Sequence, residues 1–231
     1  MFLGIDPMYW MMMLPVLLLS MWASFKVKAN FAKYSKEQIS SGLTGAKAAE
    51  YILKVNGLSN VRVEMTNGFL SDHYDPTSKV VRLSPDVYNG NNIAAVGVAA
   101  HETGHALQHA QNYSPLILRN TVVPLAKIGS WMSYLCIFGG FLLSALGLVK
   151  VGIVLFSFVV FFQVITLPVE FNASSRAKEL LASYNMVSPQ ELSGVKDVLG
   201  AAAMTYVAAA ASAIVTLLYY VLRSGVLSSD D

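Results

Sequence analysis

Residues 128–169 read IGSWMSYLCIFGGFLLSALGLVKVGIVLFSFVVFFQVITLPV, and Lys150 is the single charged residue in this stretch. A helix needs about 20 apolar residues to cross the core of a bilayer. The two halves, 128–149 and 151–169, are therefore predicted as transmembrane helices joined by a tight turn at Lys150. Residues 7–25 and the alanine-rich residues 198–222 are also uncharged and long enough to span. The fold class predicted is a mainly α multi-span membrane protein with four transmembrane helices.

The composition supports a lipid bilayer as the main partner of this chain. Hydrophobic residues make up 55% of it and charged residues 13%, against about 25% charged in a soluble domain. The net charge of +2 and the lack of a basic run exclude a nucleic-acid partner. One cysteine, Cys136, leaves neither an internal disulfide nor a cysteine zinc site. The sequence carries no signal for the oligomeric state.

The basic residues predict the orientation in the membrane. Of the 16 Lys and Arg residues, eleven lie in residues 26–127 and three in residues 170–197. Because Lys and Arg accumulate in cytoplasmic loops, both segments are expected in the cytoplasm. The prediction is a multi-pass protein of the plasma membrane, with both termini outside.

Residues 26–127 are expected to form a small α+β unit. Thr44 can cap a helix that ends at Gly57, and Asn91 or Asn92 can cap one that runs to about His109. Alternating residues 61–65 and the short run 79–83 predict strands, and residues 71–76 predict a loop. An extended peptide could pair with the edge of strand 79–83.

The second helix of this unit carries His101-Glu102-Thr103-Gly104-His105. Histidines at i and i+4 lie on one face of a helix, so both rings can reach one zinc ion. A glutamate directly after the first histidine is placed to act on a water at that ion. The motif predicts a zinc site with one Zn2+ per chain, His101 and His105 as ligands, and Glu102 as the catalytic base.

A catalytic zinc usually has a third protein ligand. His109 is excluded because i and i+8 lie about 12 Å apart along a helix. The metzincin pattern fails because Gln108 and Gln111 stand where it needs Gly and His. Glu170 is the better ligand, since two spans separate it from His105 and so return it to the same side. Weaker candidates are Glu179, Glu191 and Asp197. His73 could contact substrate or stay a simple turn residue.

Three runs, DHYDPTSKVVRLSPDVY, AAVGVAAHETGHALQ and PVEFNASSRA, give the chain a family resemblance. It resembles the YugP-like neutral zinc metallopeptidases of bacterial membranes and, more distantly, the HtpX-like gluzincins. The resemblance implies zinc on His101, His105 and Glu170, with Glu102 catalytic. Those distant relatives carry an aspartate four residues after the glutamate ligand. Here Ser174 stands at that position, so Ser174 or Asn172 is expected to support a ligand instead.

We interpret residues 26–127 as a zincin-like metalloprotease unit, which residues 170–197 complete. Its expected substrate is a peptide or a membrane protein. A zinc-binding scaffold without turnover is the alternative, although holding metal does not require Glu102. A zinc transporter should carry acidic or histidine ligands inside its spans, and these spans have none. An intramembrane protease would need an aspartate within a span, which is also missing.

Overall fold

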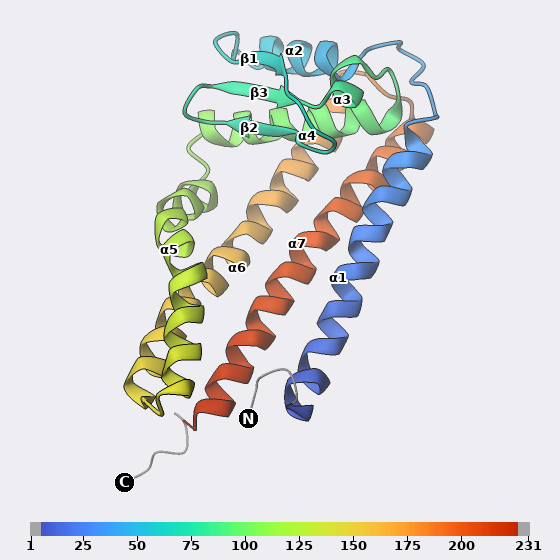
Figure 1. The fold of residues 1–231 in the computed structure, drawn as a ribbon. Helices are drawn as coiled ribbons and strands as arrows, with labels where there is room; N and C mark the ends of the chain where they lie inside the picture. The colour runs from blue at the N-terminus through green and yellow to red at the C-terminus, as the bar shows by residue number, and fades with distance from the viewer. Residues whose placement is uncertain (1–5, 226–231) are drawn as a thin grey trace. The chain divides into compact units, whose positions relative to one another are not determined.

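The structure is a computed structural model that describes residues 6–225. The elements, in chain order, are α1 (Pro7–Tyr34), α2 (Gly45–Val55), β1 (Arg62–Met65), β2 (His73–Asp75), β3 (Val80–Leu83), α3 (Pro85–Asn89), α4 (Ile93–Ala110), α5 (Ser114–Leu142), α6 (Leu146–Ser183) and α7 (Pro189–Ser224) (Figure 1). They form two compact units. One unit comprises residues 23–116 and 169–204, and the rest of the described chain forms the other.

Four helices, α1, α5, α6 and α7, are long and apolar enough to cross a membrane. The chain is therefore a mainly α multi-pass membrane protein with a small sheet, as the sequence predicts. The turn between the second and third spans differs from the prediction. It lies at residues 143–145, where Ser144 takes a φ of 52°, and Lys150 is inside α6. The charge on Lys150 does not end a helix, because a lysine near a helix terminus can extend its ammonium toward water.

The unit that contains most of the apolar helices is packed through small residues. A Cβ on Gly129 would lie 2.6 Å from the carbonyl oxygen of Leu155, and one on Gly152 would lie 2.9 Å from that of Ser133. Glycine at these positions lets the backbones of α5 and α6 approach closely, as is common between helices in membranes. In the same unit, the Tyr219 hydroxyl donates a 3.0 Å hydrogen bond to Asp6.

The other unit is built around the three-stranded sheet, whose strand order is β1-β3-β2. β3 pairs in parallel with β1 and antiparallel with β2. The prediction that strand 79–83 offers a free edge is therefore wrong, because both of its edges are already paired. The edges belong to β1 and β2. The prediction of a loop over residues 71–76 is also wrong, because β2 lies within it. This strand has only three residues, too few to show the alternation of apolar and polar residues that marks a strand.

Two helix caps in this unit form as predicted and fix where the helices begin. The Thr44 side chain accepts a hydrogen bond from the Lys47 amide at the start of α2. The Asn92 side chain accepts one from the Ala95 amide at the start of α4. α2 and α4 pack on each other and on the sheet around a core of Ile52, Val81, Leu83 and Val96. This core holds α4 in place, and α4 carries the motif residues.

Candidate metal centre

His101 and His105 lie one turn apart on α4, with their ring centroids 4.8 Å apart and the ring planes nearly perpendicular. The seven residues before His101, from Ala94 to Ala100, are small or β-branched, and all of them except the half-buried Val98 are buried. This segment of α4 packs in the interior of the unit, and the two histidines that follow it are only partly buried. The two side chains keep 12% and 13% of their surface exposed, enough for access from solvent.

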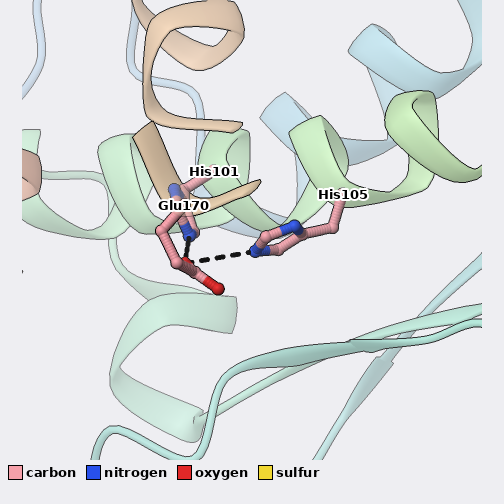
Figure 2. Close-up of side chains that lie close together, drawn as sticks. All are labelled: His101, His105 and Glu170. Atoms are coloured by element: carbon pink, nitrogen blue, oxygen red, sulfur yellow. Dashed lines mark ion pairs between the residues drawn. The ribbon is translucent and has the colours of Figure 1, made fainter. Parts of the chain in front are cut away.

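Glu170 reaches the same point from α6 (Figure 2). One of its carboxylate oxygens, Oε2, lies 3.3 Å from His101 Nε2 and 3.5 Å from His105 Nε2. Gly104 explains how α6 comes so close. A Cβ at that position would lie 2.8 Å from the carbonyl oxygen of Ala173. The glycine inside the motif therefore allows α4 and α6 to touch, one turn of α6 away from Glu170.

The three side chains fit a zinc ion by distance and by chemistry. Their ligand atoms all lie within 4.8 Å of one another. Ligands bound to a tetrahedral zinc at 2.0–2.2 Å are separated by about 3.3–3.6 Å, which matches the distances to Glu170. Two imidazoles and a carboxylate are also the donors found in catalytic zinc sites, where a fourth position stays open.

The second nitrogen of each imidazole has a hydrogen-bond partner. His101 Nδ1 lies 3.1 Å from Ser174 Oγ, and His105 Nδ1 lies 2.9 Å from Gln108 Oε1. Metal-binding histidines commonly donate their other N–H in this way, which turns Nε2 and its lone pair toward the ion. Ser174, expected as a supporting residue, contacts His101. Asn172, the other candidate, forms no hydrogen bond with either histidine and instead accepts one from Gln108.

Glu102 is buried beside this cluster, with 8% of its surface exposed. Burial raises the pKa of its carboxyl group, and the nearby His101 and His105 only partly oppose the shift. A carboxyl with a raised pKa holds a proton more readily than a solvated glutamate does. That property suits a group that accepts a proton and later returns it.

The remaining candidates lie elsewhere. His73 is exposed on β2, where its Nδ1 is 2.8 Å from the Ser71 carbonyl oxygen. Glu179 is exposed on α6. Glu191 accepts hydrogen bonds from Ser40 and Ser188, and Asp197 accepts one from Tyr34. None of the four belongs to the cluster of His101, His105 and Glu170.

No role was predicted from the sequence for Gln108, Tyr74 or Asp72. Gln108 is fully buried on α4. The Tyr74 hydroxyl is 2.9 Å from Nδ1 of His109, and so joins β2 to the helix that carries the motif. Asp72 precedes β2 and accepts hydrogen bonds from the backbone and hydroxyl of Ser84. His109, one turn past the motif, could have drawn attention to this pair. Its partner Tyr74 is 35 residues away in the sequence, so no local pattern connects the two.

Comparison with known proteins places the chain in a family. A family model described as "Putative neutral zinc metallopeptidase" matches residues 9–225. The chain is 54% identical over 204 residues to the "Putative membrane protease YugP" of Bacillus subtilis (strain 168), covering 88% of this chain and 91% of that protein. No solved structure matches. With nearly its whole length matched, the chain belongs to the neutral zinc metallopeptidase family that this model describes.

Proposed function

We propose that the chain is a membrane-bound zinc endopeptidase that hydrolyses peptide bonds, with His101, His105 and Glu170 as the zinc ligands and Glu102 as the general base. The observation that carries the proposal is the convergence of the three side chains. Glu170 lies 65 positions beyond His105 in the sequence, yet its carboxylate oxygen and the two imidazole nitrogens have separations that suit one zinc ion. The family match supports the choice of zinc.

When bound, zinc supplies a Lewis acid and lowers the pKa of a water toward about 7. The protein's own residues do the rest. Glu102 takes the proton from the attacking water and passes it to the nitrogen of the departing amine. Because Glu102 is buried, few waters compete for that proton. Ser174 and Gln108 keep the two imidazoles oriented while the reaction proceeds.

The substrate is proposed to be an extended peptide or an exposed segment of a membrane protein. β2 is one of the two edge strands of the sheet, and β2 contacts α4. An extended chain pairing with this edge would run beside the metal centre. Tyr74 on β2 and His109 on α4 form a hydrogen-bonded pair there, and we assign the Tyr74 hydroxyl the role of donor to a carbonyl oxygen of the substrate, with His109 holding that hydroxyl in place.

The orientation proposed is an active site in the cytoplasm, with both termini outside. The support is the placement of Lys and Arg, since residues 26–127 and 170–197 hold fourteen of the sixteen. The motif and Glu170 belong to one compact unit, so they must lie on one side of the membrane. The cytoplasmic side is the one that the basic residues favour.

Glu102→Gln tests the proposal against a zinc-binding scaffold without turnover. The amide keeps the size of the side chain but cannot take a proton. Purified protein in detergent is incubated with β-casein and with quenched fluorescent peptides, and zinc content is measured in parallel. We expect wild type and the control Glu179→Gln to cleave, and Glu102→Gln to lose at least 100-fold in rate while keeping its zinc. Equal cleavage by Glu102→Gln would refute its role as base.

A further inference from the structure

The β1–β2 loop, residues 66–72, carries two large apolar side chains on the surface of its unit. Phe69 keeps 60% of its surface exposed, and Leu70 keeps 36%. Between Glu64 and Asp72 the sequence reads MTNGFLS, without a charged residue. Adjacent exposed apolar side chains on an uncharged segment are typical of a surface that contacts something less polar than water. A partner of that kind is therefore expected at the tip of this loop.

The backbone of Leu70 gives a second reason to expect such a partner. Leu70 has a φ of 52°, in the left-handed region that bulky apolar residues rarely adopt. Asparagine and aspartate are favoured there, because a short polar side chain can hydrogen-bond locally. A leucine at this position costs conformational energy, and in water its side chain gains nothing in return. Contact of the side chain with lipid would offset that cost.

The contact between Phe69 and Phe31 places the loop beside the end of α1 that leaves the membrane. The two rings meet edge to face, with their centroids 5.6 Å apart. The uncharged part of α1 ends at Phe25, and Lys26 and Lys28 follow it. Because lysines are costly in the hydrocarbon and collect at its boundary, the hydrocarbon ends near Phe25.

The height of Phe69 above the hydrocarbon follows from the rise of the helix. Phe31 comes six residues after Phe25, which corresponds to a rise of about 9 Å. Side chains on a helix lean toward its N-terminus, which for α1 is the membrane end, so the Phe31 ring lies closer to the bilayer than its Cα does. The headgroup layer on each side of the hydrocarbon is about 5–7 Å thick. Phe69 and its neighbour Leu70 are therefore within reach of this layer.

Hydrogen bonds within the loop prepare it for surroundings less polar than water. The Ser71 hydroxyl donates to the carbonyl oxygens of Asn67 and Gly68, at 3.0 and 3.1 Å. The Ser71 carbonyl oxygen lies 2.8 Å from Nδ1 of His73. Each polar group that is paired inside the protein lowers the cost of moving the loop out of water.

We propose that Phe69 and Leu70 insert into the lipid headgroup layer and hold the metal centre close to the membrane surface. β2 follows the loop directly, and Tyr74 on β2 is hydrogen-bonded to His109 on α4, the helix that carries the motif. The four residues from Leu70 to Tyr74 span at most about 14 Å of extended chain. This inference rests on the function proposed above, and it makes the expected substrate a segment of a membrane protein that lies close to the bilayer.

Fluorescence quenching by spin-labelled lipid tests the insertion without any need for activity. In a Cys136→Ser background, Leu70→Cys, Phe25→Cys and Glu50→Cys are each labelled with the fluorophore NBD. The full chain is reconstituted in phosphatidylcholine–phosphatidylglycerol vesicles, where phosphatidylcholine with a nitroxide on its headgroup is the quencher. Phe25 is the control at the membrane boundary, and Glu50, which is exposed on α2, is the control in water.

We expect the label at position 70 to be quenched about as strongly as the label at position 25. It should be quenched at least about twofold more strongly than the label at position 50, because interfacial apolar groups reach about 5–10 Å into the headgroup and acyl boundary. Quenching at position 70 as weak as that at position 50 would overturn the insertion.

The double variant Phe69→Ser, Leu70→Asn tests what the insertion does for the substrate. Asparagine suits the left-handed backbone at position 70, and circular dichroism checks the fold. The probe is a quenched fluorescent peptide, added either free or tethered to a lipid in the vesicles that hold the enzyme. We expect the variant to cleave the free peptide as wild type does, and the tethered peptide about threefold or more slowly, because the loop no longer sets the height of the site. An equal loss on both peptides would mean that the loop binds substrate and would overturn the proposal.

Failure of the proposed function would look different. Wild type that cleaves neither peptide would overturn the peptidase activity, and the quenching at position 70 would still decide whether the loop contacts lipid. Strong quenching at position 70, together with unchanged cleavage of the tethered peptide by the double variant, would uphold the insertion and overturn its effect on substrate choice.

Discussion

Gly104→Ala should separate the two helices that bring the zinc ligands together. The added Cβ would start 2.8 Å from the Ala173 carbonyl oxygen, and ordinary contact begins at 3.4 Å, so α4 and α6 must move apart by 0.6 Å at this point. The obstacle is backbone, which cannot rotate away as a side chain would. Ligand distances in zinc sites vary by only about 0.2 Å. We therefore expect zinc affinity to fall at least tenfold.

The effect on stability is smaller, because two terms oppose each other. Forcing an extra methyl group into a packed contact costs about 1–3 kcal/mol. Alanine gains about 1 kcal/mol over glycine in a helix interior. The net loss expected is about 0–2 kcal/mol, so thermal unfolding shifts little while zinc binding weakens clearly. That separation distinguishes displaced ligands from general unfolding.

Gly97→Ala is the matched control on the same helix. Its Cβ would meet the Val195 side chain at 3.3 Å, and a side chain can shift by the required tenth of an ångström. Zinc affinity is measured for both variants by competition with a chromophoric chelator in the same detergent. We expect Gly97→Ala to bind as wild type does. If Gly104→Ala binds zinc as tightly as Gly97→Ala, the account of how Glu170 reaches the histidines is wrong.

Three further predictions concern substrate, ligand support and topology. Tyr74→Phe should lower turnover about tenfold or more on casein with zinc content unchanged, since it removes one donor; unchanged turnover would rule out its role. Ser174→Ala should weaken zinc about tenfold through His101, and a zinc affinity equal to that of wild type would show that the hydroxyl is dispensable. In a Cys136→Ser background, an impermeant thiol reagent applied to cells should label a cysteine at Lys150 but not at Ser40 or Ser188. The reverse pattern would place the site outside the cytoplasm.

Local sequence patterns were sufficient for much of the fold. Uncharged runs of about 20 residues predict the spans because the bilayer imposes that length. Thr44 and Asn92 predict helix starts because a side-chain oxygen there can accept from a free backbone amide. The spacing of His101 and His105 predicts a shared ligand face because a helix repeats about every 3.6 residues.

The features that the sequence missed depend on contacts between distant segments. Strand 79–83 was expected at an edge, yet its central place follows from pairing with β1 and with a three-residue β2. Gln108 is an ordinary polar residue until α6 lies against it. Gly104 likewise acquires its role only where Ala173 touches α4. Such roles depend on contacts between distant segments, and the local pattern of apolar and polar residues does not reveal them.

The zinc content of three purified proteins tests whether Glu170 is the third zinc ligand. Wild type, Glu170→Ala and Glu179→Ala are purified in one detergent, their folding is checked by circular dichroism, and zinc is measured by mass spectrometry. Glu179 is the matched control because it lies exposed on the same helix, outside the ligand cluster. We expect one zinc per chain in wild type and Glu179→Ala, and a steep loss in Glu170→Ala. Full zinc occupancy in Glu170→Ala, with loss in Glu179→Ala, would contradict it.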